Sequence, residues 1–237
     1  MANPFFSDER FSTQRNSSGG VMTVTGAANK SIILVGVTFA SAMITFQHPL
    51  PFALLIGCAI LAFILSLVTS FKPSVSPVTA PLYALTEGLT LGAISAMYAG
   101  KYTGIVLQAV MLTFGTLFSL LALYRMGVLR MSGGLARFLV VSTAGIALTY
   151  LLSWILSFFH VSVPFIHSSG TFGILFSVFV VIVAALGFIQ DFAVIEEGAR
   201  QEAPAYMEWY SAFGLLVSLV WLYLEILRLL AKLRSRD

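Results

Sequence analysis

Seven long apolar segments, separated by short breaks rich in glycine, proline and serine, dominate this sequence of 237 residues. An α-helix needs about 20 apolar residues to cross the roughly 30 Å hydrocarbon core of a membrane. The segments are continuously hydrophobic rather than alternating, which favours membrane-spanning helices and argues against a β-barrel. They fall at residues 31–46, 52–71, 78–98, 104–124, 138–159, 172–195 and 213–231.

The composition leads to the same fold class. Hydrophobic residues make up 58% of the chain and charged residues only 10%, too few to cover the surface of a soluble domain of this length. We therefore predict an all-α, polytopic membrane protein with seven transmembrane helices. Residues 1–29 are predicted to form a polar, mostly disordered cytoplasmic tail, and residues 30–237 a seven-helix transmembrane domain. The lipid bilayer is the expected environment, and no nucleic-acid partner is expected.

The distribution of lysine and arginine predicts the orientation in the membrane. Basic residues concentrate in cytoplasmic connections, and here the tail and the second, fourth and sixth connections hold most of them, whereas the first, third and fifth hold only Lys101. The N-terminus is therefore predicted to be cytoplasmic. Seven crossings would place the C-terminus on the opposite side, yet it carries Lys232, Arg234 and Arg236, so these basic residues disagree with the predicted orientation.

Three carboxylates, Glu87, Asp191 and Glu225, lie inside apolar segments. An ionisable side chain in a membrane costs about 2.5–3.5 kcal/mol on insertion scales and is tolerated mainly where it faces a bundle interior, a water-filled path or a partner. These acids are therefore the candidate functional residues.

Asp191 and Glu225 lie in consecutive segments and are predicted to meet. Counted from a turn near Gln201, Glu225 lies more than twice as far along the chain as Asp191. If the aromatic-rich segment 205–213 lies along the membrane interface, however, the last span begins near Gly214. Glu225 is then almost as far into its span as Asp191 is from the turn. Equal depth would bring the two carboxylates together.

Such a pair has defined chemistry. Two carboxylates in a low-dielectric site cannot both ionise at low cost, so they would share a proton. Loss of that proton leaves two repelling anions unless a cation enters, and carboxylate oxygens suit a hard ion such as Ca²⁺. Asp191 and Glu225 are therefore predicted to sense pH and to bind Ca²⁺ transiently, with no resident cofactor.

From Thr23 to its end the chain resembles the Bax inhibitor (transmembrane Bax inhibitor motif) family, and its bacterial branch most. The resemblance rests on LYALTEGLTLGAISAMY in the third segment, FIQDFAVIEEG at the end of the sixth and WLYLEILRLL in the seventh. It implies seven helices with the last one central in the bundle, and a pH-sensitive calcium leak.

The resemblance also implies roles for individual residues. The family's acid pair corresponds to Asp191 and Glu225, and its third-helix acid to Glu87. The basic residue that latches the pair in some relatives has Lys72 as its candidate. The chain departs from the family pattern in having Glu225 where many relatives have aspartate, and in a longer sequence interval between the two acids.

Simpler interpretations remain open for the same residues. Arg228 lies three residues after Glu225 on one helix and could act only as its counter-charge. Asp191 could be an interfacial acid beside an acidic connection, and Glu87 could serve packing. The glycines, in particular Gly88 and Gly92, are predicted to allow close helix packing. That prediction also covers Gly36, Gly115, Gly145 and Gly173.

The favoured function is a pH-sensitive calcium or cation leak across a membrane, with Ca²⁺ and protons as its partners. The alternative is a membrane protein that binds and regulates a protease or a stress or cell-death component without ion flux. An enzyme is not expected, because the glycine context of intramembrane aspartyl proteases is absent before Asp191 and all three histidines lie in loops. The resemblance points to the bacterial cytoplasmic membrane.

Overall fold

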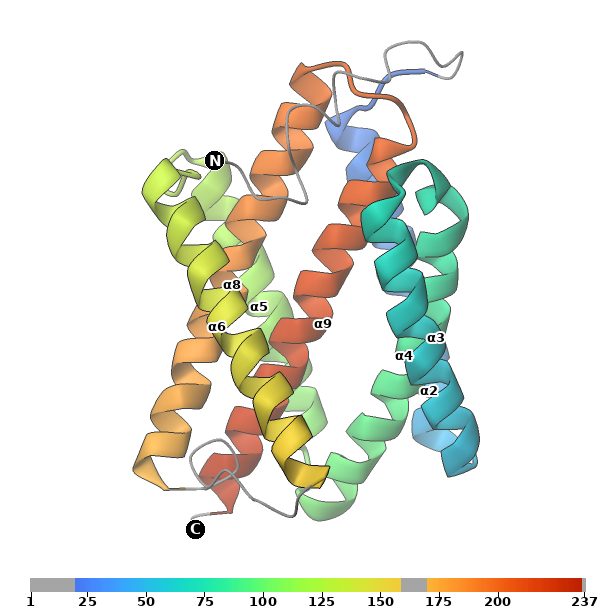
Figure 1. Ribbon diagram of the computed structural model, residues 1–237, viewed down its shortest axis with the longest axis vertical. Coiled ribbons are helices and arrows are strands. Elements are labelled where there is room, and N and C mark those ends of the chain that lie inside the picture. Colours follow the sequence, from blue (N-terminus) through green and yellow to red (C-terminus); the bar gives the residue numbers. More distant parts are fainter. Residues whose placement is uncertain (1–19, 159–169, 236–237) are drawn as a thin grey trace. The chain divides into compact units, whose positions relative to one another are not determined.

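A computed structural model describes residues 20–158 and 170–235, and the regular secondary structure within these residues is all helical. Within these two ranges, seven α-helices and one short 3-10 helix follow one another (Figure 1). They are α2 (Val24–Gln47), α3 (Phe52–Phe71), η1 (Pro73–Val75), α4 (Ser76–Lys101), α5 (Ile105–Arg125), α6 (Gly133–Phe158), α8 (Thr171–Arg200) and α9 (Met207–Arg234).

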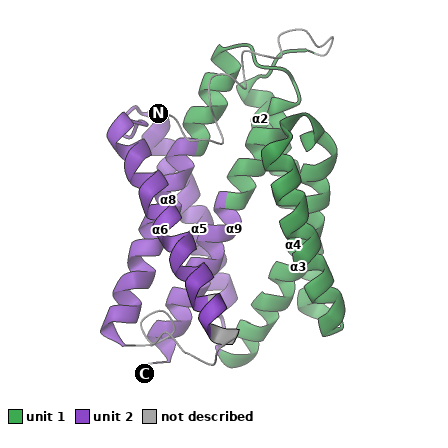
Figure 2. Ribbon diagram, in the orientation of Figure 1, with its two compact units in different colours: residues 1–101, 191–217 green, residues 102–190, 218–237 purple. Residues whose placement is uncertain are grey.

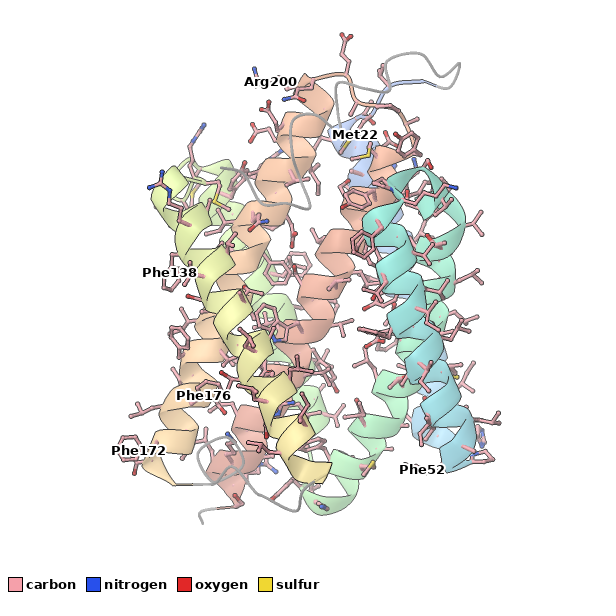
Figure 3. All side chains as sticks on the ribbon, in the orientation of Figure 1. Met22, Phe52, Phe138, Phe172, Phe176 and Arg200 are labelled. Carbon is pink, nitrogen blue, oxygen red and sulfur yellow. The ribbon has the colours of Figure 1, made fainter. Side chains whose placement is uncertain are left out.

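Six of these helices, all except α4, are long and apolar enough to cross a membrane. The all-helical, multi-pass fold predicted from the sequence is thereby confirmed. Phe52, Phe138 and Phe172 project outward from their helices in Figure 3, with exposed fractions of 78%, 43% and 75%. Large apolar side chains exposed in this way suit contact with lipid. Among the six, α9 has the largest buried share.

α4 has 26 residues and differs from the other helices in composition rather than in length. Its serines, threonines and glycines, together with Glu87, make it less apolar than the other six. That α4 crosses the membrane stays a prediction.

The helix starts differ from the predicted ones at two places. α2 begins at Val24, where the Thr23 side chain accepts a hydrogen bond from the Gly26 N–H, so residues 24–29 belong to the helix and not to the polar tail. Residues 1–19 lie outside the described part of the chain. α9 begins at Met207 and continues to Arg234, so residues 207–213 are part of this helix, and that segment 205–213 lies along the membrane interface stays a prediction.

The chain divides into two compact units (Figure 2). Unit 1 contains residues 1–101 and 191–217, and unit 2 contains residues 102–190 and 218–237. Both α8 and α9 contribute one part to each unit. The prediction of one domain over residues 30–237 stays a prediction.

In unit 1, α4 packs against α2 and α3. A side chain at Gly88 would overlap Ser41 and the backbone of Thr38. The Thr45 hydroxyl donates a hydrogen bond to the Leu89 carbonyl over 2.8 Å. α2 therefore approaches α4 through small and hydroxyl-bearing residues, as transmembrane helix pairs commonly do.

In unit 2, the core lies between α6 and α8, with Trp221 of α9 packed against it. Leu139 and Ile146 of α6 meet Val180 and Val183 of α8, all of them buried. This packing fixes the face that α6 turns toward the second half of α9.

Candidate functional site

Glu225 is at the centre of a buried polar group in unit 2. It is only 2% exposed, and the Tyr150 hydroxyl of α6 lies 3.1 Å from each of its carboxylate oxygens. Arg228, one turn further along α9, donates from Nη1 to Glu225 Oε1 and to the Tyr150 oxygen, both over 2.7 Å. The guanidinium carbon also lies 5.0 Å from the centre of the Tyr150 ring. The hydrogen bond between Arg228 and Glu225 joins two charged groups, which makes it one of the stronger kind.

Lys232 lies two turns beyond Glu225 on the same face of α9 and is 7% exposed. Its ammonium group donates to the Gly173 carbonyl over 3.0 Å and to the Ser177 hydroxyl over 2.8 Å, both on α8. Residues at spacings of three and four share one side of a helix. Glu225, Arg228 and Lys232 therefore form one polar face of α9, directed at α6 and α8.

The same face continues toward the middle of α9. Ser218 of α9 lies next to Gly187 of α8, and a methyl group at that glycine would be 3.8 Å from the Ser218 hydroxyl. From Ser218 to Lys232 the polar face extends along about 21 Å of helix. We call these residues, Ser218, Glu225, Arg228 and Lys232, the polar face of α9.

Asp191 is 8% exposed and lies in α8, where unit 1 takes over from unit 2. Since α9 starts at Met207, Glu225 lies about twice as far into its helix as Asp191 lies from the end of α8 at Arg200. The predicted equal depth was counted from a span that starts near Gly214 rather than from the start of the helix, and it stays a prediction. Asp191 belongs to unit 1 and Glu225 to unit 2, and their pairing stays a prediction.

Glu87 lies half-buried in α4, within unit 1. One turn earlier on the helix, Tyr83 packs edge-on against Phe213 of α9, with ring centres 5.0 Å apart. Lys72, the candidate latch, is exposed at the end of α3, and none of the ion pairs among the described residues includes it. Within the described residues there is also no group of three or more histidine, cysteine or acidic side chains able to hold a metal ion.

A buried acid, a hydroxyl and two basic residues on neighbouring helices are thus present in an all-helical membrane protein. The model of the Bax inhibitor 1 like family matches residues 3–235, nearly the whole chain. The chain belongs to the Bax inhibitor 1-like family. A comparison with curated proteins finds no match. Family membership agrees with the resemblance seen in the sequence and indicates a membrane channel or regulator.

This family member also has a third buried acid, which the sequence did not single out. Glu208, in the first turn of α9, is 7% exposed and accepts hydrogen bonds from the Thr23 N–H and hydroxyl over 2.8 and 2.9 Å. It also forms an ion pair with Lys30, whose ammonium group lies 5.5 Å from the centre of the Trp209 ring. A side chain at Gly26 would collide with the Glu208 carboxylate, so only glycine permits this approach.

Backbone hydrogen bonds also join these two parts of the chain. We call the contact of residues 20–30 with residues 203–209 the N-terminal clamp. The Met22 N–H donates to the Ala203 carbonyl over 2.7 Å, and the Ala205 N–H donates to the Gly20 carbonyl over 2.9 Å. Figure 3 labels Met22 at this place. The adjacent Tyr206 is partly buried, which raises the pKa of its phenol, so the side chain stays neutral at physiological pH.

Sequence reasoning missed Tyr150, Lys232 and Glu208. The seven-residue spacing of Lys232 from Glu225 was a usable signal, because it places both on one face of a helix. Tyr150 gave no signal, since a tyrosine in an apolar segment is most simply a core residue. Glu208 gave no signal, because its partners Thr23 and Lys30 lie 185 and 178 residues away along the chain.

Proposed function

We propose that this Bax inhibitor 1-like protein is a pH-sensitive cation leak with calcium as its favoured ion. The observation that carries the proposal is Glu225, an acid with 2% exposure inside a helix apolar enough to cross a membrane. Such a residue is expensive in a bilayer and is retained mainly for function. Asp191, also buried in a membrane-spanning helix, is the second titrating acid, and Glu87 contributes to the path or to packing.

The contacts of Glu225 suggest the direction of gating. Its carboxylate faces Arg228 and the Tyr150 hydroxyl, and as an anion it offsets one of the two positive charges of Arg228 and Lys232. Protonation removes the only negative charge of this group and leaves Arg228 and Lys232 positive. Cations are then repelled along the polar face of α9, so the leak is proposed to fall in acid and to rise as the acids ionise. Calcium is the permeant substrate and not a resident cofactor, and no catalytic chemistry is proposed.

The test is calcium flux into proteoliposomes across pH 5–8 for the wild type, Asp191→Asn and Glu225→Gln. A leak that rises with pH, and whose pH dependence both substitutions flatten, supports the proposal. Protein that is folded but gives no more flux than empty liposomes overturns it. Whether the two acids meet is a separate question, answered by disulfide formation between cysteines at 191 and 225 after Cys58→Ser removes the native thiol.

A second candidate function, regulation of a membrane partner without ion flux, is favoured by the N-terminal clamp. The clamp fixes the chain at residues 20–23 beside the α8–α9 connection, so a tail that binds a partner would emerge there. Deletion of residues 1–19 should then abolish co-purification of a cross-linked partner from native membranes while any flux is unchanged.

We further propose that the membrane is the bacterial cytoplasmic membrane and that the N-terminus is cytoplasmic. Labelling of a cysteine introduced near residue 10 in intact cells would check the orientation.

A further inference from the structure

The two units differ strongly in charge. Unit 1 contains eight acidic and six basic residues, whereas unit 2 contains seven basic residues and only two acidic ones, Glu225 and Asp237. Glu225 is therefore the only acid among the described residues of unit 2. A cation moving along the polar face of α9 meets one negative charge and then a concentration of positive charge.

Lys232 is the buried part of that positive charge. The Gly173 carbonyl and the Ser177 hydroxyl hold its ammonium group at 3.0 and 2.8 Å. Both oxygens are formally neutral acceptors of hydrogen bonds from the ammonium group. The carboxylate of Glu225, the one described acid of this unit, forms its ion pair with Arg228, with 2.7 Å between Oε1 and Nη1.

We propose that Lys232 is a selectivity residue, a fixed positive charge that sets the height of the barrier to cations along the polar face of α9. The inference rests on the proposed leak function and adds to it the residue that keeps the leak slow. A buried charge acts more strongly than an exposed one, because less water screens it. The exposed arginines of unit 2, Arg125, Arg130 and Arg137, contribute less for the same reason.

The proposal makes a quantitative distinction between ions. The electrostatic part of the barrier is proportional to the charge of the passing ion, so removal of one fixed charge lowers it twice as much for Ca²⁺ as for K⁺. The relative increase in Ca²⁺ flux is then the square of that in K⁺ flux. A threefold rise for K⁺ therefore predicts about a ninefold rise for Ca²⁺. A merely loosened helix bundle would raise both fluxes by a similar factor.

The experiment compares Lys232→Gln with the wild type in proteoliposomes, measuring K⁺ and Ca²⁺ flux on the same preparations at pH 8. Glutamine keeps amide N–H donors for Gly173 and Ser177 and removes the charge. Lys232→Met is the second neutral variant, in case the first does not fold. Lys232→Arg, which keeps the charge, should restore wild-type selectivity. Lys101→Met, at an exposed lysine of unit 1, is the control for the removal of any positive charge.

A larger relative rise for Ca²⁺ than for K⁺ in the neutral variants, absent in Lys101→Met, supports the assignment. Equal rises, or no change while the wild type leaks, overturn the role of Lys232 and leave the leak itself standing. No flux from wild type and variants alike overturns the proposed function, and the role of Lys232 with it.

Discussion

The ion pair between Lys30 and Glu208 should stabilise unit 1 measurably. Their side chains are 21% and 9% exposed, between a surface pair, worth about 0–1 kcal/mol, and a fully buried one, whose disruption costs about 3–5 kcal/mol. We therefore expect a coupling energy of about 1–3 kcal/mol. Glu208→Gln should cost about 2 kcal/mol, because it keeps an acceptor for Thr23 but removes the charge that Lys30 faces.

The assay is thermal unfolding in detergent for the wild type, Lys30→Met, Glu208→Gln and the double variant. For a domain of this size, a loss of about 2 kcal/mol corresponds to a fall in Tm of about 4–8 °C. Arg200 and Glu197 form an exposed ion pair one turn apart at the end of α8, so Glu197→Gln is the matched control and should leave Tm unchanged. If the two single-variant losses simply add in the double variant, the ion pair does not stabilise the clamp and the reasoning is refuted.

Three further predictions follow from single contacts. Gly88→Ala should destabilise the protein by about 1–3 kcal/mol in thermal unfolding, because the added methyl group overlaps the backbone of α2. Gly115→Ala is the control and should leave the stability unchanged, because its methyl group meets open space. Equal effects of the two substitutions would contradict the packing argument. Tyr150→Phe should lower the stability by about 1–3 kcal/mol in the same assay, because Arg228 and the Glu225 carboxylate each lose a hydrogen-bond partner. An unchanged Tm would exclude a stabilising role for the Tyr150 hydroxyl. Burial raises the pKa of Tyr206, so ionisation of its phenol opposes folding, and the stability of the protein should fall as pH rises above about 10. Tyr206→Phe should lessen that fall when stability is measured in an alkaline titration. An identical profile in the variant would refute the assignment of the fall to Tyr206.

The sequence predicted helix positions well wherever apolar runs were bounded by turn residues. α3 occupies the predicted range 52–71, and α5 is displaced from its predicted range by one residue at each end. Predicted and observed starts differ most at α2 and α9, where the residues are small, polar or aromatic. The hydrogen bonds of Thr23 and Lys30 to Glu208 join these two starts, and no local pattern reveals them.

Side-chain partners within one helix were predictable and those between helices were not. Arg228 lies where the sequence placed a counter-charge for Glu225, because a spacing of three determines that geometry. Close approach at Gly88 and Gly92 was predicted and is observed, but the same prediction was wrong for Gly36, Gly115 and Gly145, which face open space. A glycine permits close packing, and only the partner helix decides whether packing occurs.

The basic C-terminus, which disagreed with seven crossings in the sequence, has a structural use. Arg234 donates from its two terminal nitrogens to the Thr103 carbonyl over 2.5 Å and to Gln108 over 2.9 Å, near the start of α5. Lys232 binds the first turns of α8. Two of the three C-terminal basic residues therefore hold helix ends together, and the count of basic residues overstates how strongly this end favours the cytoplasm.

The contact at the first turn of α9 limits how many of the preceding helices can cross a membrane. Its first turn binds Thr23 through Glu208, next to the start of α2, whereas its last turn binds Thr103 through Arg234. α9 is a single helix of 28 residues, about 42 Å long, which exceeds the thickness of the hydrocarbon core. If α9 crosses the membrane, Thr23 and the first turn of α9 lie on the same side, because they are in contact, and the number of crossings between them is even. The six described helices from α2 to α8 meet that condition and five do not, so if the other five all cross, α4 must cross with them despite its polar composition.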